Sequence, residues 1–211
     1  MEFITSLIDF ILHVDKHLVE IVRDYGTWTY LVLFMIIFSE TGFVVTPFLP
    51  GDSLLFVIGA LGASGALNFK LSLIILIIAA VGGNTLNYFI GRMLGHKILA
   101  INNSRIFKRE YLYKTQAFYK KHGGKAIILS RFIPIIRTFA PFVAGLGKMN
   151  FVKFNFFNMI GGVSWVLLFM FAGNLFGNIP AVKNNFTYVI FAIIFVSLLP
   201  TIIPYIRSKI R

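Results

Sequence analysis

Apolar residues dominate the chain and form long runs that short polar or basic stretches separate. The run at 71–91 contains 21 uncharged residues, enough to cross a hydrocarbon core about 30 Å thick. Two further long runs cover 154–182 and 184–206, and a shorter run covers 25–39. The long runs predict transmembrane helices.

The first 24 residues have a different pattern, in which polar and apolar positions recur every three or four residues. Polar side chains such as Glu2 and Asp9 fall on one helical face, and Ile4 and Ile11 fall on the other. This pattern predicts an amphipathic helix over 1–24 that lies in the membrane interface instead of spanning the bilayer.

Two apolar segments, 41–66 and 126–147, are too interrupted for ordinary spans. Proline lacks a backbone N–H and disfavours continuous helix, while glycine permits tight turns. We therefore predict two re-entrant hairpins, because irregular backbone at membrane depth needs protein cover or a water-filled cavity. Core packing would explain the glycines equally well. The residues predicted to shape the hairpins are Pro47, Pro50, Gly51, Pro134, Pro141 and Gly145.

Composition supports an integral membrane protein with one compact membrane domain at 25–206. The chain is 57% hydrophobic and 13% charged, whereas soluble domains carry about 25% charged residues. It has no cysteine, which excludes disulfides, thiolate nucleophiles and cysteine metal sites. His13 and His17 are four residues apart, as paired metal ligands can be, but a solvated helical face explains them better, and His96 and His122 show no recognisable ligand spacing. We predict no metal, no cofactor and no enzymatic activity.

The distribution of positive charge predicts a topology. If 126–147 is re-entrant, the segments 92–125, 148–153 and 207–211 lie on one side of the membrane, and they hold 14 of the 20 Lys and Arg residues. The positive-inside rule makes that side cytoplasmic, so the basic loop 92–125 and the tail 207–211 are cytoplasmic. The hairpin at 41–66 then enters from the outside. The net charge of +12 fits anionic lipid better than nucleic acid.

A short internal similarity relates Phe-Ile-Gly-Arg-Met-Leu-Gly at 89–95 to Phe-Ala-Gly-Asn-Leu-Phe-Gly at 171–177. Each broken segment is followed by a full span, and the predicted topology gives the two halves opposite orientations. We therefore predict an inverted repeat of transmembrane helices and opposed re-entrant hairpins, an architecture found in transporters.

Four ionisable residues remain in or beside the broken segments: Glu40, Asp52, Arg131 and Arg137. Each costs about 2.5–3.5 kcal/mol to insert at the centre of a membrane helix, so their presence needs a reason. One interpretation is two structural ion pairs that pin the hairpins together. The other is a polar site in which the arginines bind an anionic headgroup and the carboxylates exchange protons. The two interpretations overlap, because an ion pair that occupies the arginines in the empty site would have to break when a phosphate binds.

Polar residues in the span at 71–91 are candidates for lining that site. Asn84 and Tyr88 share one helical face, and Asn87 shares another with two glycines. Helix packing accounts for these residues as well as site lining does. Arg92 follows at the predicted cytoplasmic end, as an anchor or as a headgroup ligand.

Three motifs resemble the DedA family, also called SNARE-associated or VTT-domain membrane proteins. The first is Glu40 with Pro-Phe-Leu-Pro-Gly-Asp-Ser at 47–53, the second Tyr-Phe-Ile-Gly-Arg at 88–92, and the third Ser-Arg-Phe-Ile-Pro-Ile-Ile-Arg-Thr-Phe-Ala-Pro at 130–141. The resemblance implies a bacterial cytoplasmic membrane protein with two opposed re-entrant hairpins. It also implies that the functional acids and arginines of the family correspond to Glu40, Asp52, Arg131 and Arg137.

The family is associated with moving lipids between leaflets, including undecaprenyl phosphate recycling and phosphatidylethanolamine transport, and with proton-dependent transport. The leading hypothesis is therefore a translocase for a phosphate-bearing lipid, with undecaprenyl phosphate as the first choice. One alternative is a flippase or scramblase for phosphatidylethanolamine or another phospholipid. Another is a proton-coupled transporter of small ions or drugs. The expected partners are anionic lipid headgroups and protons, and the sequence leaves open whether the protein forms a homo-oligomer.

Overall fold

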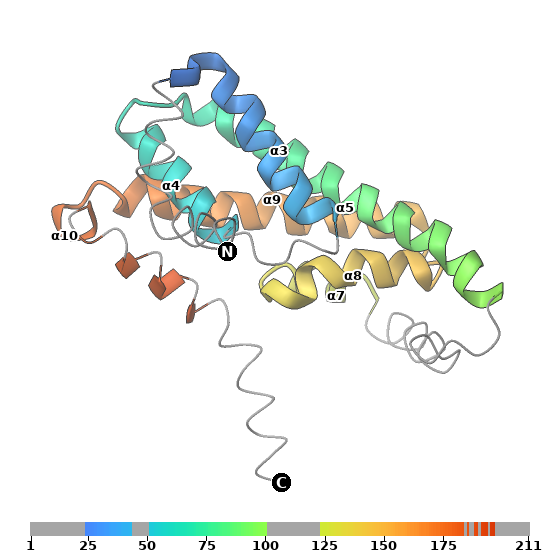
Figure 1. The fold of residues 1–211 in the computed structure, drawn as a ribbon. Helices are drawn as coiled ribbons and strands as arrows, with labels where there is room; N and C mark the ends of the chain where they lie inside the picture. The colour runs from blue at the N-terminus through green and yellow to red at the C-terminus, as the bar shows by residue number, and fades with distance from the viewer. Residues whose placement is uncertain are drawn as a thin grey trace, which may run out of the picture. The chain divides into compact units, whose positions relative to one another are not determined.

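A computed structural model describes residues 24–43, 51–100 and 123–183, together with 185, 188, 189, 191–193, 195 and 196. All regular elements in these ranges are helical (Figure 1), which confirms the predicted all-α architecture for the described part of the chain. The elements are η1 (Gly26–Trp28), α3 (Thr29–Gly42), α4 (Gly51–Ala63), α5 (Phe69–Ala100), α7 (Lys125–Ser130), α8 (Pro134–Leu146), α9 (Phe151–Phe176) and α10 (Pro180–Lys183).

Several sequence predictions lie outside the described residues. They are the amphipathic helix at 1–24 except its last residue, Pro47 and Pro50, the centre of the basic loop, most of the run at 184–206 and the tail at 207–211.

In the part of the chain that the structure describes, two helices are long and apolar enough to cross a membrane. They are Phe69–Leu94 within α5 and Phe151–Phe176, the whole of α9, and each contains 26 residues. At 1.5 Å per residue such a helix is about 39 Å long, more than the hydrocarbon thickness. The predicted spans at 71–91 and 154–182 are thus found as helices, although α9 ends at Phe176.

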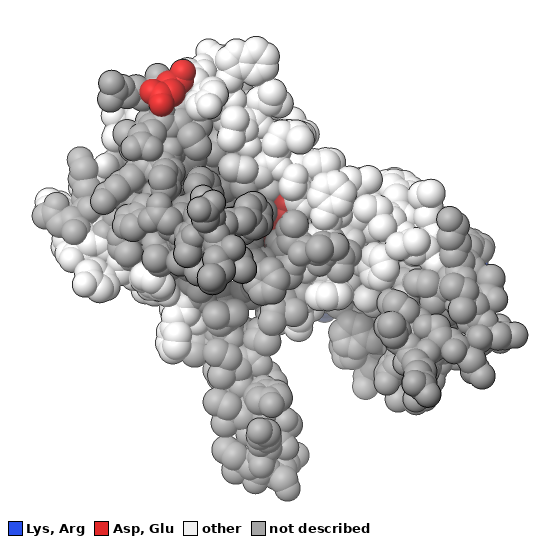
Figure 2. All heavy atoms as spheres, in the orientation of Figure 1, with Lys and Arg blue, Asp and Glu red and all other residues white. Residues whose placement is uncertain are grey.

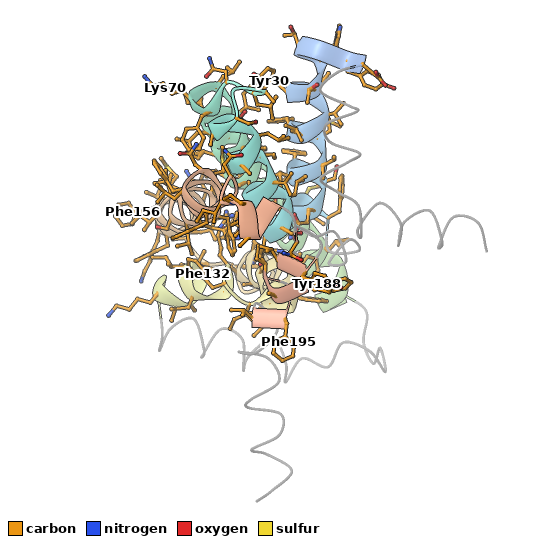
Figure 3. All side chains as sticks on the ribbon, turned by 90° about the vertical axis from the view of Figure 1, so that its left-hand side faces the viewer. Tyr30, Lys70, Phe132, Phe156, Tyr188 and Phe195 are labelled. Carbon is orange, nitrogen blue, oxygen red and sulfur yellow. The ribbon has the colours of Figure 1, made fainter. Side chains whose placement is uncertain are left out.

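The exposed surface of the long helices is mostly apolar. Ile78 on α5 and Val152, Phe156 and Leu168 on α9 are each more than half exposed, and Figure 3 shows Phe156 pointing away from α9. The described part of the face in Figure 2 is almost entirely uncharged. Large apolar side chains exposed in this number are unusual for a soluble domain and suit contact with lipid.

The segment predicted to break at 126–147 does break, and it forms α7 and α8. Ile133 adopts an extended conformation, as expected for a residue that precedes proline. Pro134 then occupies the first turn of α8, where a missing N–H costs nothing. Pro141, in contrast, lies inside α8 and does not end it. Proline disfavours continuous helix, yet α8 continues through this position with one backbone donor fewer.

The segment predicted to break at 41–66 contains the end of α3 and all of α4. Gly51 is the first residue of α4, and residues 51–60 are buried. Gly65 has a φ of +80° in the turn that follows, a conformation that favours glycine. The Asn68 side chain accepts a hydrogen bond from the Leu71 N–H and so caps the start of α5.

The described residues form two compact units. Unit 1 comprises those within 1–37, 48–78 and 166–211, and unit 2 comprises those within 38–47 and 79–165. The helices α3, α5 and α9 each contribute residues to both units.

In unit 1, α4 packs directly against the second half of α9. A Cβ atom on Gly59 would lie 2.1 Å from the Met170 carbonyl oxygen, and one on Gly173 would lie 1.9 Å from the Phe56 carbonyl oxygen. Both distances are too short for any side chain, so each helix needs a glycine where the other approaches. In the same unit the Asn68 N–H donates to the Tyr30 hydroxyl over 2.9 Å.

In unit 2, α8 packs against the second half of α5 in the same way. A Cβ atom on Gly145 would lie 2.0 Å from the Tyr88 carbonyl oxygen, and one on Gly91 would lie 2.0 Å from the Phe142 carbonyl oxygen. Gly91 and Gly173 occupy the same position in the similar segments 89–95 and 171–177. The internal sequence similarity therefore coincides with a repeated helix contact.

Candidate functional site

Among the described residues of unit 2, three charged side chains are buried, and they come from three helices or their ends. Glu40 lies near the end of α3, Arg131 directly follows α7, and Arg137 lies in the first turn of α8. Their relative exposures are 0%, 1% and 3%. Burying a charge is costly unless it is paired and hydrogen-bonded, so the contacts of each group indicate its role.

Arg137 and Glu40 form an ion pair within unit 2. Arg137 Nη2 donates a hydrogen bond to Glu40 Oε1 over 2.6 Å. Such charge-assisted bonds are among the stronger interactions in proteins. The pair links α8 to the end of α3.

Arg131 is held by neutral acceptors. Its Nη2 donates to Asn158 Oδ1 over 2.6 Å and to the Ala80 carbonyl oxygen over 3.1 Å. The amide orientation that satisfies Asn84 places its oxygen 2.9 Å from the same Nη2 and its nitrogen 3.3 Å from the Thr41 carbonyl oxygen. Within the described ranges, no carboxylate forms an ion pair with Arg131.

Part of the Arg131 guanidinium has no hydrogen-bond partner among the described residues. Its Nε and Nη1 are buried and make no hydrogen bond to a described residue. Buried unsatisfied donors are uncommon, and a ligand or water is a usual explanation. The Trp165 ring lies close to both arginines, with its centroid 4.8 Å from the Arg137 guanidinium carbon and 6.0 Å from that of Arg131. These distances permit cation–π attraction.

The residues predicted to line the site have different surroundings. Asn84 contacts Arg131, as described above. Asn87 donates to the carbonyl oxygens of Thr41 (3.2 Å) and Thr138 (2.8 Å) and so joins α3, α5 and α8. Tyr88 donates to the Met149 carbonyl oxygen, and Arg92, which is exposed, donates to the Tyr88 hydroxyl.

Asp52 belongs to unit 1. It lies in the first turn of α4 and is 8% exposed, and a carboxylate there is favoured by the helix dipole. The structure thus brings Glu40, Arg131 and Arg137 together in one unit and gives Asp52 to the other.

Sequence analysis missed two residues of this cluster, Asn158 and Trp165. Both are fully buried on α9, on the face that also carries Gly162. A Cβ atom on Gly162 would lie 3.2 Å from Arg131 Nη2, so this glycine leaves room for the guanidinium. Asn158, Gly162 and Trp165 are spaced by four and then three residues in an apolar run, which places them on one helical face. This spacing was the available sequence signal.

Comparison with known proteins identifies the family. Residues 49–175, more than half of the chain, match the VTT domain. The protein named DedA from Escherichia coli strain K12 is 56% identical over 99% of this chain and 96% of the relative. The chain belongs to the DedA family of VTT-domain proteins. This confirms the resemblance that the three motifs indicated.

More distant relatives extend the family. An uncharacterized membrane protein of Mycobacterium tuberculosis strain H37Rv is 42% identical over 83% of this chain and 78% of its own length. The inner membrane protein YqjA of E. coli strain K12 is 38% identical over 72% of this chain and 69% of its own. No solved structure matches the chain.

Family membership and the apolar helices together make this a membrane protein. Members of the DedA family are generally thought to be membrane transporters or flippases, and they are not known as enzymes.

Proposed function

We propose that this protein is a translocase that moves a phosphate-bearing lipid between the leaflets of the bacterial cytoplasmic membrane, with undecaprenyl phosphate as the first candidate. The observation that carries the proposal is Arg131, a buried cation that pairs with no described carboxylate and whose Nε and Nη1 make no hydrogen bond to a described residue. A phosphate group supplies the negative charge and the acceptors that such a guanidinium lacks.

In this proposal the two arginines share the headgroup. Arg131 binds the phosphate first, and Arg137 joins it when the ion pair with Glu40 opens. Protonation of Glu40 would release Arg137 and couple transport to a proton gradient, and Asp52 is the second proton-coupling candidate. The acyl chains stay in the bilayer, along helices whose exposed side chains are mostly apolar.

The proposed architecture is an inverted repeat with two opposed re-entrant hairpins, and its basic loop and C-terminus are cytoplasmic. The matched glycine contacts of α4 with α9 and of α8 with α5 support a repeat. The concentration of Lys and Arg in the segments assigned to one side supports the orientation.

The test is the leaflet accessibility of labelled undecaprenyl phosphate in proteoliposomes, with and without a pH gradient. We expect protein-dependent flipping that Arg131→Ala and Arg137→Ala each abolish while both variants still insert. A dependence on the gradient would show coupling, and its absence would indicate a scramblase. Normal flipping in both arginine variants would refute the residue assignment.

Two other outcomes would redirect the proposal. Flipping of phosphatidylethanolamine, without flipping of undecaprenyl phosphate, would keep a lipid translocase and change its cargo. Gradient-dependent flux of a small ion or drug, without any lipid movement, would replace the lipid translocase with a proton-coupled carrier.

A further inference from the structure

The orientation of the Asn158 amide is fixed by its neighbours. Its Nδ2 donates to the Val81 carbonyl oxygen over 3.1 Å and to Thr85 Oγ1 over 3.2 Å. The Thr85 hydroxyl donates its own hydrogen to the Val81 carbonyl over 2.8 Å, which leaves its oxygen free to accept. With two acceptors facing its nitrogen, Asn158 must present its oxygen to Arg131.

Arg131 and Arg137 therefore receive different acceptors within the same unit. The acceptor 2.6 Å from Arg137 Nη2 is the Glu40 carboxylate, whereas the acceptor 2.6 Å from Arg131 Nη2 is the Asn158 amide. An amide satisfies hydrogen bonds and carries no charge. It can fix the position of a guanidinium without neutralising it.

We propose that Asn158 is a positioning residue that makes the site selective for an anionic phosphate group. It holds Arg131 by an uncharged acceptor and so leaves the positive charge to be neutralised by the ligand. The inference deepens the proposed lipid-translocase function and rests on it for the physiological cargo. The group that the site would recognise is a phosphate anion, which both a lipid headgroup and free phosphate can supply.

The geometry around Arg131 leaves donors available for that anion. Nη2 is directed to Asn158 and Ala80, while Nε and Nη1 have no described partner. The Cβ atom that Gly161 lacks would lie 3.4 Å from Arg131 Cδ, so the side chain is confined along its length. A confined guanidinium loses less entropy on binding a ligand than a mobile one does.

The decisive variant is Asn158→Asp, which keeps the shape of the side chain and replaces the amide by a carboxylate. A carboxylate at this point would pair with Arg131 and compete with the ligand. The matched control is Asn150→Asp, since Asn150 is exposed, caps α9 by accepting from the Lys153 N–H and makes no contact with Arg131. Asn and Asp are equally good at such a position.

The first measurement is the melting temperature of the purified full-length protein in detergent, titrated with dihexanoyl phosphatidic acid or with inorganic phosphate. We expect the wild type and Asn150→Asp to be stabilised at the same lipid concentration. Asn158→Asp should need at least about tenfold more lipid, equivalent to about 1.4 kcal/mol. A response to phosphatidic acid alone would identify the lipid headgroup as the ligand, and a response to both would identify phosphate itself.

A second measurement separates a charge effect from a fold defect. A double-mutant cycle compares Asn158→Asp in the wild-type protein and in the Arg131→Gln variant. The substitution should raise the melting temperature more, or lower it less, in the wild-type background, because only there can the new carboxylate pair with Arg131. Asn158→Ala, which adds no charge, should keep a weakened stabilisation by phosphatidic acid.

The outcomes distinguish this inference from the proposed function. Stabilisation of the wild type that Asn158→Asp loses, without flipping in proteoliposomes, would support the anion site and refute the translocase. Flipping by the wild type with an unchanged titration for Asn158→Asp would overturn the role of Asn158. No response of the wild type to either phosphate source would also overturn it.

Discussion

Arg131 and Arg137 are both buried in unit 2 and both lie near Trp165, yet they differ in what compensates their charge. Arg137 contacts a carboxylate, and Arg131 contacts amide and carbonyl oxygens. In the proposed mechanism, Arg137 is paired with an internal acid in the empty site, and Arg131 binds an external anion.

At this scale the ion pair gives a direct stability prediction. Glu40→Leu should lower the free energy of unfolding by about 3–5 kcal/mol, because it leaves the buried Arg137 without its carboxylate. Adding Arg137→Met should recover most of that loss, since an apolar pair removes the uncompensated charge. Denaturant titration of the single and double variants in detergent measures both. Equal instability of the two variants would contradict a compensating role for Glu40.

The sequence was sufficient to single out the charged residues and to suggest ion pairs between them, but it did not reveal the neutral partner of Arg131. Charges in apolar runs stand out, which is why Glu40, Arg131 and Arg137 were predicted as a site. Asn158 is neutral, and 27 residues separate it from Arg131. The contact between Asn158 and Arg131 depends on how α7 and α9 pack, and no local sequence pattern encodes that packing.

Short buried helices packed on long apolar ones recur at the scale of elements. In each unit a glycine of the short helix meets a carbonyl of the long helix, and a glycine of the long helix meets a carbonyl of the short one. Close approach of backbones allows van der Waals contact, which is a main source of helix association in membranes.

This contact predicts opposite effects for two glycines of α5. Gly91→Ala should destabilise the protein by about 1–3 kcal/mol, because a methyl group would overlap the Phe142 carbonyl. Gly82→Ala is the matched control, since its Cβ would meet only the Phe38 ring at 3.4 Å. It should be neutral or stabilising by up to about 1 kcal/mol through helix propensity. Melting temperatures of the two variants test this, and equal effects would contradict the packing.

The elements themselves were only partly predictable. Pro134 marks the start of α8 because its ring restricts both its own φ and the conformation of Ile133. Pro141 has the same ring but lies within α8. Whether a proline ends a helix depends on the packing that supports its neighbours, and that packing is not local information.

Composition alone predicted the membrane class of the whole molecule, because a soluble domain of this size could not bury so many apolar residues. The internal similarity at 89–95 and 171–177 also coincided with a contact in each unit. The orientation of the chain in the membrane is a further prediction, which depends on the positions of Lys and Arg.

That orientation can be tested directly because the chain has no cysteine. We expect Ser64→Cys, in the exposed turn after α4, to react with an impermeant thiol reagent from outside intact cells. Lys153→Cys, in the exposed first turn of α9, should react only after the cytoplasmic side is opened. The reverse labelling pattern would show that the proposed orientation is inverted.

The central claim is that Arg131 binds the phosphate of a membrane lipid, and native mass spectrometry of the protein purified from its membrane tests this most directly. We predict that the wild type retains a phosphate-bearing lipid when it is released from detergent, and that Arg131→Gln loses this lipid under the same conditions. Asn150→Asp should retain the lipid as the wild type does. Equal retention by Arg131→Gln would contradict the claim.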